Sequence, residues 1–148
     1  MPLYFAYGSN LDVQQMPHRC AEAVQLVAPG CLHGYALAFT TYTSSWGGGV
    51  ADVVVAPHQE VWGLVYDISR EGLARLDVYE GYPHLYTRFQ DTIDTAQGVL
   101  TDVWIYTVVD KQEFVAPSVE YVGIIQRAAR CFAFPAAYRA WLDGIVTR

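Results

Sequence analysis

One glutamate occupies a position where a surface carboxylate is not expected. Residues 69–80 have the pattern of a helix, and Leu73 and Leu76 define its buried stripe because they are three residues apart. Glu80 follows Leu73 by seven residues and Leu76 by four, so it belongs to the same stripe. Burial raises the pKa of a carboxyl group, which suits a general acid or base. The alternative is that Glu80, at the end of the helix, reaches solvent or a neighbouring arginine. Three other charged residues of the segment fall away from the stripe: Glu71, Arg75 and Asp77.

A second candidate is the run Tyr7-Gly8-Ser9-Asn10, which ends an apolar and aromatic stretch. Glycine allows a ligand to approach the backbone closely. Successive N–H groups in such a turn form a concave site for an anion. The alternative is an ordinary turn, since Gly-Ser-Asn is common turn chemistry.

Other chemistries lack their usual patterns. The four histidines (His18, His33, His58 and His84) have no metal-ligand spacing with one another or with cysteine, so no metal or other cofactor is expected. The three cysteines (Cys20, Cys31 and Cys131) are odd in number and form no CxxC, which favours reduced thiols in the cytoplasm. No serine lies in a GxSxG elbow, and Gly47-Gly48-Gly49 lacks the lysine of a phosphate loop and predicts a tight loop.

Strands are expected to outnumber helices among the elements that position these residues. Strands are predicted at residues 3–7, 24–31, 35–41, 50–56, 61–68, 86–95 and 99–109, with hairpin turns at 57–59 and 96–98. Helices are predicted at 69–80, capped by Ser69 and ended by Gly81, at 119–131, capped by Ser118, and at 136–146. Mostly hairpin-linked strands with flanking helices indicate an α+β fold built on a curved, barrel-like sheet.

Length and composition favour one domain over residues 1–148 with a real hydrophobic core, since 53% of the residues are hydrophobic and 16% are charged. The net charge of −6 argues against a nucleic-acid partner. Residues 23–51 carry no charge, but Pro29, Gly30, Gly34 and a polar stretch at 40–49 argue against a membrane span. The first residues do not have the pattern of a secretory leader, so none is expected.

Five motifs in order along the chain resemble the γ-glutamylcyclotransferase family, which includes the plant avirulence-induced and γ-glutamylamine branches. The opening YFAYGSNL at residues 4–11 matches the family signature at every position. The later motifs are WGGGVA at 46–51, EVWGLVY at 60–66, LDVYEG at 76–81, and PSVEY at 117–121. The resemblance covers residues 4 to about 142. Two departures are a short loop at 81–85 and a chain that ends soon after its third helix.

The resemblance implies a mixed, partly closed β-barrel with flanking helices and a cavity. It implies that Glu80 is catalytic and that the substrate contacts Tyr4, Phe5, Ala6, Tyr7, Gly8, Ser9, Asn10, Leu11, Tyr86 and Tyr121. Either Trp104 or Tyr106 is expected to occupy another aromatic position of the cavity.

The implied reaction converts a γ-glutamyl amino acid or amine into 5-oxoproline and the free amino acid or amine, without a metal or cofactor. A γ-glutamylamine or another γ-glutamyl-tagged small molecule is the alternative substrate. Glutathione is less expected, because the signature of that branch departs from YGSN at Asn10. From a different class, the chain is alternatively a binding module that keeps the cavity without catalysis. The oligomeric state stays open, a homodimer included.

Overall fold

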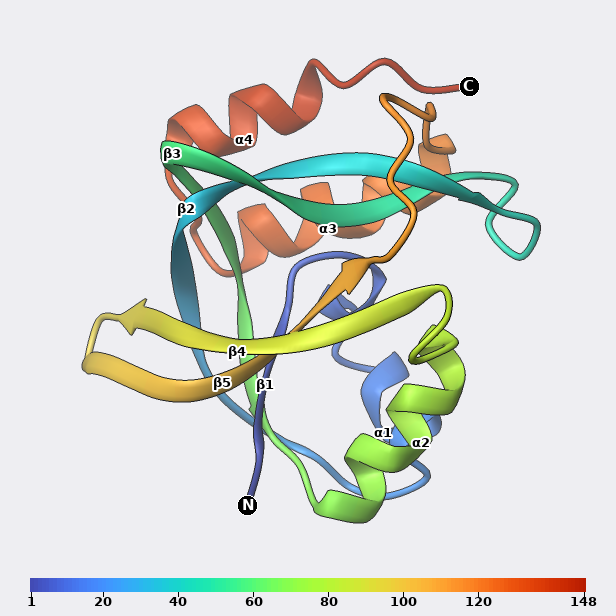
Figure 1. Ribbon diagram of the computed structural model, residues 1–148. Coiled ribbons are helices and arrows are strands. Elements are labelled where there is room, and N and C mark those ends of the chain that lie inside the picture. The colour runs from blue at the N-terminus through green and yellow to red at the C-terminus, as the bar shows by residue number, and fades with distance from the viewer.

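Five strands close into a barrel in the computed structural model, which describes residues 1–148 (Figure 1). The order around the barrel is β1 (Leu3–Ala6), β3 (Gly48–Asp67), β2 (Gln25–Thr43), β4 (Tyr86–Thr95) and β5 (Gly98–Val108). All pairs are antiparallel except β1 with β5, whose parallel pairing closes the ring. The predicted mixed barrel is confirmed, and it is closed rather than partly closed.

Strands β2 and β3 form one long hairpin of 19 and 20 residues, where the sequence predicted four shorter strands. The hairpin turns at residues 44–47, so the turn predicted at 57–59 is wrong. Residues 56–59 instead form a bulge opposite Gly34, because the register passes from His33 with Glu60 to Tyr35 with Val55. Gly34 and His58 take positive φ angles there, so turn-forming residues bend a continuous strand.

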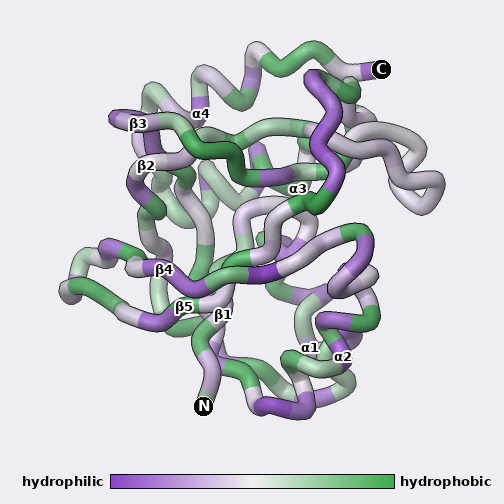
Figure 2. Tube along the Cα trace, viewed as in Figure 1, coloured by the Kyte–Doolittle hydropathy of each residue, from purple (hydrophilic) through white to green (hydrophobic).

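The long hairpin extends beyond the barrel and runs along α3 (Val119–Cys131) and α4 (Ala136–Asp143) in Figure 1. Residues 109–117 return along this extension, where Gln112 N and Val115 N donate to the carbonyls of Thr40 and Phe39. Figure 2 shows the hydrophilic part of this segment on the outside of the hairpin. A Cβ atom on Gly49 would collide with the Val115 carbonyl, which explains part of the glycine run at this point.

Two of the three predicted helices have the predicted bounds and caps. Helix α2 (Arg70–Glu80) begins where Ser69 Oγ accepts from Gly72 N, and it ends at Gly81 with a φ of 70°. Helix α3 begins in the same way, with Ser118 Oγ accepting from Tyr121 N. Helix α4 ends three residues earlier than predicted. Two short elements were not predicted: the 3-10 turn η1 (Ser9–Leu11) and helix α1 (Gln15–Cys20), which packs on α2.

The core fills the barrel and continues under α3 and α4. Its largest fully buried side chains include Phe5, Tyr66, Leu76, Ile105 and Phe134. The three cysteines are free thiols. No helix combines the length and the apolar character that crossing a membrane requires.

Candidate active site

A cavity of about 220 Å³ opens where several elements meet. Its walls come from β1 and η1, the end of α2, the start of β4, the end of β5, the start of α3, and the turn of the β2–β3 hairpin with the first residues of β3. Residues of the signature motif and of the LDVYEG motif therefore meet in space although about 70 residues separate them along the chain. The fold brings together the two candidates that the sequence indicated separately.

Glu80 lies in the cavity wall at the C-terminal end of α2, with Leu73 and Leu76 buried along the same helix face. The pKa of Glu80 is raised to about 7, mainly because the surrounding protein desolvates the carboxylate and to a smaller extent because the carboxylate of Asp77 is nearby. Arg19 and a hydrogen bond from Asn10 act in the opposite direction. The side chain of Glu80 thus faces the cavity rather than open solvent, and its carboxyl group titrates near neutral pH.

Asn10 connects Glu80 to the signature segment. Its Nδ2 donates to Tyr4 Oη at 2.8 Å and lies 3.5 Å from Glu80 Oε1, while its Oδ1 accepts from the Arg19 guanidinium. Arg19 also donates to Ser9 Oγ at 3.0 Å and stacks over the Tyr79 ring. Arg19 is the positively charged residue beside Glu80, and its guanidinium is held in place by Asn10, Ser9 and Tyr79.

Two cavity tyrosines are positioned by the backbone of one residue. Ala51 N donates to Tyr121 Oη at 2.9 Å, and Tyr86 Oη donates to Ala51 O at 2.6 Å. The Tyr121 hydroxyl proton is left available to a ligand, whereas Tyr86 has free acceptor lone pairs. Burial raises the pKa of Tyr86 well above its ordinary value, so this hydroxyl stays neutral. Gly8 is required beside them, because a Cβ there would lie 2.8 Å from Tyr121 Oη.

Asp77, predicted to fall away from the buried stripe, is partly buried against the β4–β5 hairpin. Its Oδ1 accepts from Arg88 Nε at 2.8 Å and from Tyr106 Oη at 2.6 Å. Residues just off the stripe of a helix still face a neighbouring element when a sheet curves around the helix. Asp77 thereby fixes Tyr106 at the cavity wall and ties α2 to β5.

The structure separates the predicted substrate residues into two groups. Seven line the cavity: Tyr4, Tyr7, Gly8, Ser9, Asn10, Tyr86 and Tyr121. Phe5, Ala6 and Leu11 do not, because their side chains are at most 2% exposed and belong to the core. Of the two alternatives, Tyr106 lines the cavity and Trp104 does not, its ring lying under the Arg88 guanidinium instead.

Sequence reasoning did not assign the turn of the β2–β3 hairpin or Arg19 to the site. Residues 43–46, which the sequence separated from the site by more than 30 positions, form part of the cavity wall. Trp46 packs edge-on against Tyr121 at 5.1 Å between ring centroids. No local pattern indicated Arg19, because α1 has only six residues and no capping side chain. The one available signal was that Arg19 is a basic residue close to the signature motif in a chain with few basic residues.

Comparisons with known proteins point to one family. The profile of the family "Gamma-glutamyl cyclotransferase, AIG2-like" matches residues 4–122. Curated gamma-glutamylcyclotransferases from Bos taurus and Homo sapiens are 31% and 30% identical to this chain over 148 positions. These alignments cover 97% of this chain and 78% of each relative.

The solved structure of a gamma-glutamyl cyclotransferase superposes with a TM-score of 0.90 at 28% identity, covering 99% of this chain and 89% of that one. An AIG2-like protein from Mus musculus shares the fold at a TM-score of 0.57 and 17% identity, over 82% of each chain. The chain belongs to the AIG2-like gamma-glutamyl cyclotransferase family.

Proposed function

We propose that this protein is a γ-glutamylcyclotransferase that converts a γ-glutamyl amino acid or amine into 5-oxoproline and the released amine. The α-amine of the γ-glutamyl group attacks its own γ-carbonyl, so nucleophile and electrophile belong to one molecule. The catalyst must fold the substrate into a reactive conformation and move protons. The observation that carries the proposal is the placement of Glu80, with a pKa of about 7, beside the signature segment in one cavity.

Glu80 takes two roles in the proposed sequence. As a carboxylate it accepts a proton from the attacking α-amine while the new C–N bond closes the five-membered ring. As a carboxylic acid it returns that proton to the leaving nitrogen when the original amide bond breaks. A pKa near the working pH allows one group to act in both directions at little cost. After the products are released, Glu80 is again an ionised carboxylate, as it was at the start.

The signature segment is assigned to binding and charge stabilisation. The first backbone N–H groups of a helical turn have no hydrogen-bond acceptor within the turn. Those of η1 are therefore suited to bind the carboxylate of the substrate or the oxyanion that develops during the reaction. Burial raises the pKa values of Tyr4 and Tyr121 above their ordinary range, so these hydroxyls remain donors at neutral pH. The free thiols fit the reducing cytoplasm, where we place the protein.

The test is Glu80→Gln, which keeps the shape of the side chain and removes its acid–base function. We expect 5-oxoproline release to fall by about 10²- to 10⁴-fold, the usual contribution of a general acid–base. Glu71→Gln, an exposed site on the same helix, is the matched control and should keep full activity. Retention of most activity by Glu80→Gln would refute the assignment.

A substrate panel identifies the leaving group. γ-Glutamyl amino acids, γ-glutamylamines and glutathione are each incubated with the protein, and 5-oxoproline is quantified. We expect turnover of the first two classes to exceed that of glutathione. Tight binding of γ-glutamyl compounds without 5-oxoproline would instead identify a binding module.

A further inference from the structure

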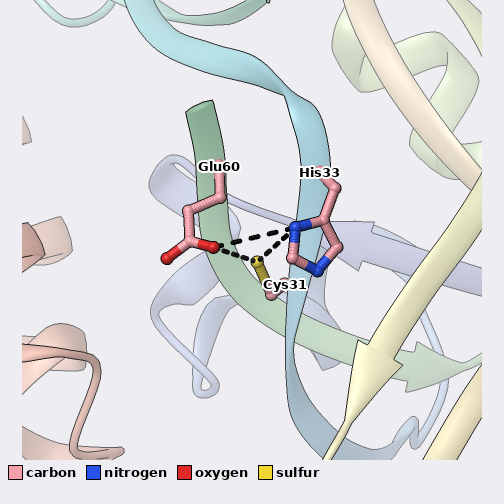
Figure 3. Close-up of side chains that lie close together, drawn as sticks. All are labelled: Cys31, His33 and Glu60. Atoms are coloured by element: carbon pink, nitrogen blue, oxygen red, sulfur yellow. Dashed lines mark hydrogen bonds and ion pairs between the residues drawn. The ribbon is translucent and has the colours of Figure 1, made fainter. Parts of the chain in front are cut away.

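A second group of chemically active side chains lies on the barrel wall, away from the catalytic cavity. Cys31 and His33 on β2 and Glu60 on β3 point toward one another (Figure 3). Cys31 Sγ lies 3.4 Å from Glu60 Oε2 and 4.0 Å from His33 Nδ1, and Glu60 Oε2 lies 3.7 Å from His33 Nδ1. Three atoms of different ligand types thus form a small triangle.

Strand pairing explains why these residues meet. Cys31 and His33 are two positions apart on β2 and share a face. Glu60 is the cross-strand partner of His33, and Asp94 on β4 is the partner of Cys31. Directly paired residues project to the same side of a sheet, so all four reach one face. The sequence offered no metal-ligand spacing because the group is assembled across three strands.

The triangle has the dimensions of a tetrahedral zinc site. Bonds of about 2.3 Å to sulfur and about 2.1 Å to nitrogen and oxygen place ligand atoms about 3.3–3.6 Å apart at tetrahedral angles. The distances between the three side chains depart from this by a few tenths of an ångström. One thiolate, one imidazole and one carboxylate suit zinc, whereas magnesium and calcium prefer oxygen ligands alone.

The outer atoms of two ligands are already held. Asp94 Oδ2 lies 2.7 Å from His33 Nε2, and a carboxylate at this position favours the imidazole tautomer that carries its proton on Nε2. In that tautomer the Nδ1 lone pair faces the thiol and is free to bind a metal. Trp62 Nε1 donates to Glu60 Oε1 at 3.0 Å and leaves Oε2 for the centre of the triangle. Carboxylate–histidine pairs of this kind orient metal ligands and increase their basicity. No arginine or lysine forms an ion pair with Glu60 or Asp94, so a bound cation would meet two carboxylates without competition from a positively charged side chain.

The group opens to solvent and is separate from the proposed active site. Cys31 is buried, His33 and Glu60 are exposed, and all three border a hollow of about 470 Å³. This hollow shares no residue with the catalytic cavity. Tyr86 of the cavity and Asp94 stand at opposite ends of β4, eight residues and about 26 Å apart along the strand. Three ligands leave a fourth position for water or an external ligand.

We propose that Cys31 Sγ, His33 Nδ1 and Glu60 Oε2 bind one zinc ion, with Asp94 and Trp62 as positioning residues and an open fourth position. Binding replaces the thiol proton by the metal and releases that proton to solvent. The site stands independently of the cyclotransferase proposal, because no residue is shared.

The test uses the full chain, stripped with a chelator and titrated with Zn²⁺ and with Co²⁺ as the spectroscopic probe. We expect one Zn²⁺ per chain, and a Co²⁺ complex with a thiolate charge-transfer band and the intense visible bands of tetrahedral coordination. Cys31→Ser should abolish the charge-transfer band, and His33→Gln, at an exposed site, should weaken Zn²⁺ binding by at least tenfold. Circular dichroism establishes that each variant is folded.

Controls separate this site from adventitious binding. Cys131→Ser removes the exposed thiol on α3 and should leave stoichiometry and spectrum unchanged. Asp94→Asn should keep the spectrum and weaken Zn²⁺ affinity by about 10- to 100-fold, as expected for a group acting through His33. Absence of stoichiometric binding by the wild-type chain would overturn the proposal, as would equal binding by folded His33→Gln and wild type.

Discussion

Glu80 carries a stability cost that follows directly from its raised pKa. The folded protein holds this proton to a pKa of about 7, whereas an exposed glutamate releases it near 4.5. Between these values the folded state binds more protons than the unfolded chain, so stability falls as pH rises. The contribution of Glu80 is complete below about pH 4.5 and is lost as pH passes through 7. The ionised carboxylate of Glu80 therefore lowers the stability of the fold above neutral pH.

Glu80→Gln should therefore stabilise the protein in a pH-dependent way. At about pH 9 we expect the free energy of unfolding to increase by about 3 kcal/mol, and at about pH 4 by close to zero. Urea unfolding at both pH values measures the difference, with Glu71→Gln as the exposed control. An equal effect at both pH values would contradict the burial of an ionisable Glu80.

Arg19 sets where the proton of Glu80 titrates. Its positive charge favours the carboxylate, so Arg19→Met should raise the pKa of Glu80 further. The acidic limb of kcat/KM should then move to higher pH, with about a tenfold loss of rate below the limb for each pH unit. Arg19→Lys keeps the charge and should move the limb less. Arg75→Met, at an exposed ion pair on α2, should leave the profile in place.

Single residues were the most predictable level of the site. Two leucines and helical periodicity placed Glu80 on the buried stripe of a helix with clear caps at Ser69 and Gly81. They left open whether the side chain at the helix end turns toward solvent, and the cavity that receives it required the structure. Periodicity failed for Asp52, which no pattern distinguished from surface acids. Its side chain is completely buried on β3. Successive side chains of a strand point to opposite faces of the sheet. Whether both faces are buried depends on the elements that pack against the sheet, which a local pattern does not reveal.

Asp52 joins several elements at once. It accepts from Thr40 on β2, from Thr107 and the Val108 amide on β5, and from Lys111 Nζ at 2.7 Å. The hairpin extension, the end of β5 and the segment after it are therefore held by one carboxylate. Replacing such a group is strongly destabilising, because its partners lose the hydrogen-bond acceptor and the opposite charge that they need.

Asp52→Asn should destabilise the fold by about 3 kcal/mol, since it removes the charge opposite Lys111 and replaces one acceptor oxygen by a donor that faces other donors. Urea unfolding at neutral pH measures the loss. Glu71→Gln, which breaks only an exposed ion pair, should change stability by less than about 0.5 kcal/mol. A loss as small as that of the control would show that the buried carboxylate of Asp52 and its partners contribute little to stability.

Among the elements, those bounded by local signals were predicted and those bounded by distant contacts were not. The caps of α2 and α3 and the turn of β4–β5 are encoded within a few residues. The continuity of β3 through Pro57 and His58 is not, because the bulge there is maintained by pairing with β2. Helix α1 is too short to stand alone and depends on its packing against α2.

Across the whole molecule, strand order places the two proposed sites at opposite ends of β4. The cavity lies where β4 begins and β5 ends, and the proposed zinc ligands lie near the end of β4. The class of fold followed from hairpin-linked strands and from the motifs, whereas closure through the parallel β1–β5 pair required the structure. A parallel neighbour is determined by the whole topology, which no local pattern encodes.

The extended β2–β3 hairpin has a consequence for how this family can diversify. Its tip borders the cavity that contains Glu80, yet the tip lies outside the ring of paired strands and is largely exposed. Because residues 44 and 45 pair with no strand, insertions or replacements there should leave the closure of the barrel intact. Under the proposed function, such changes would alter which leaving group is accepted while Glu80 and the residues that hold it stay in place.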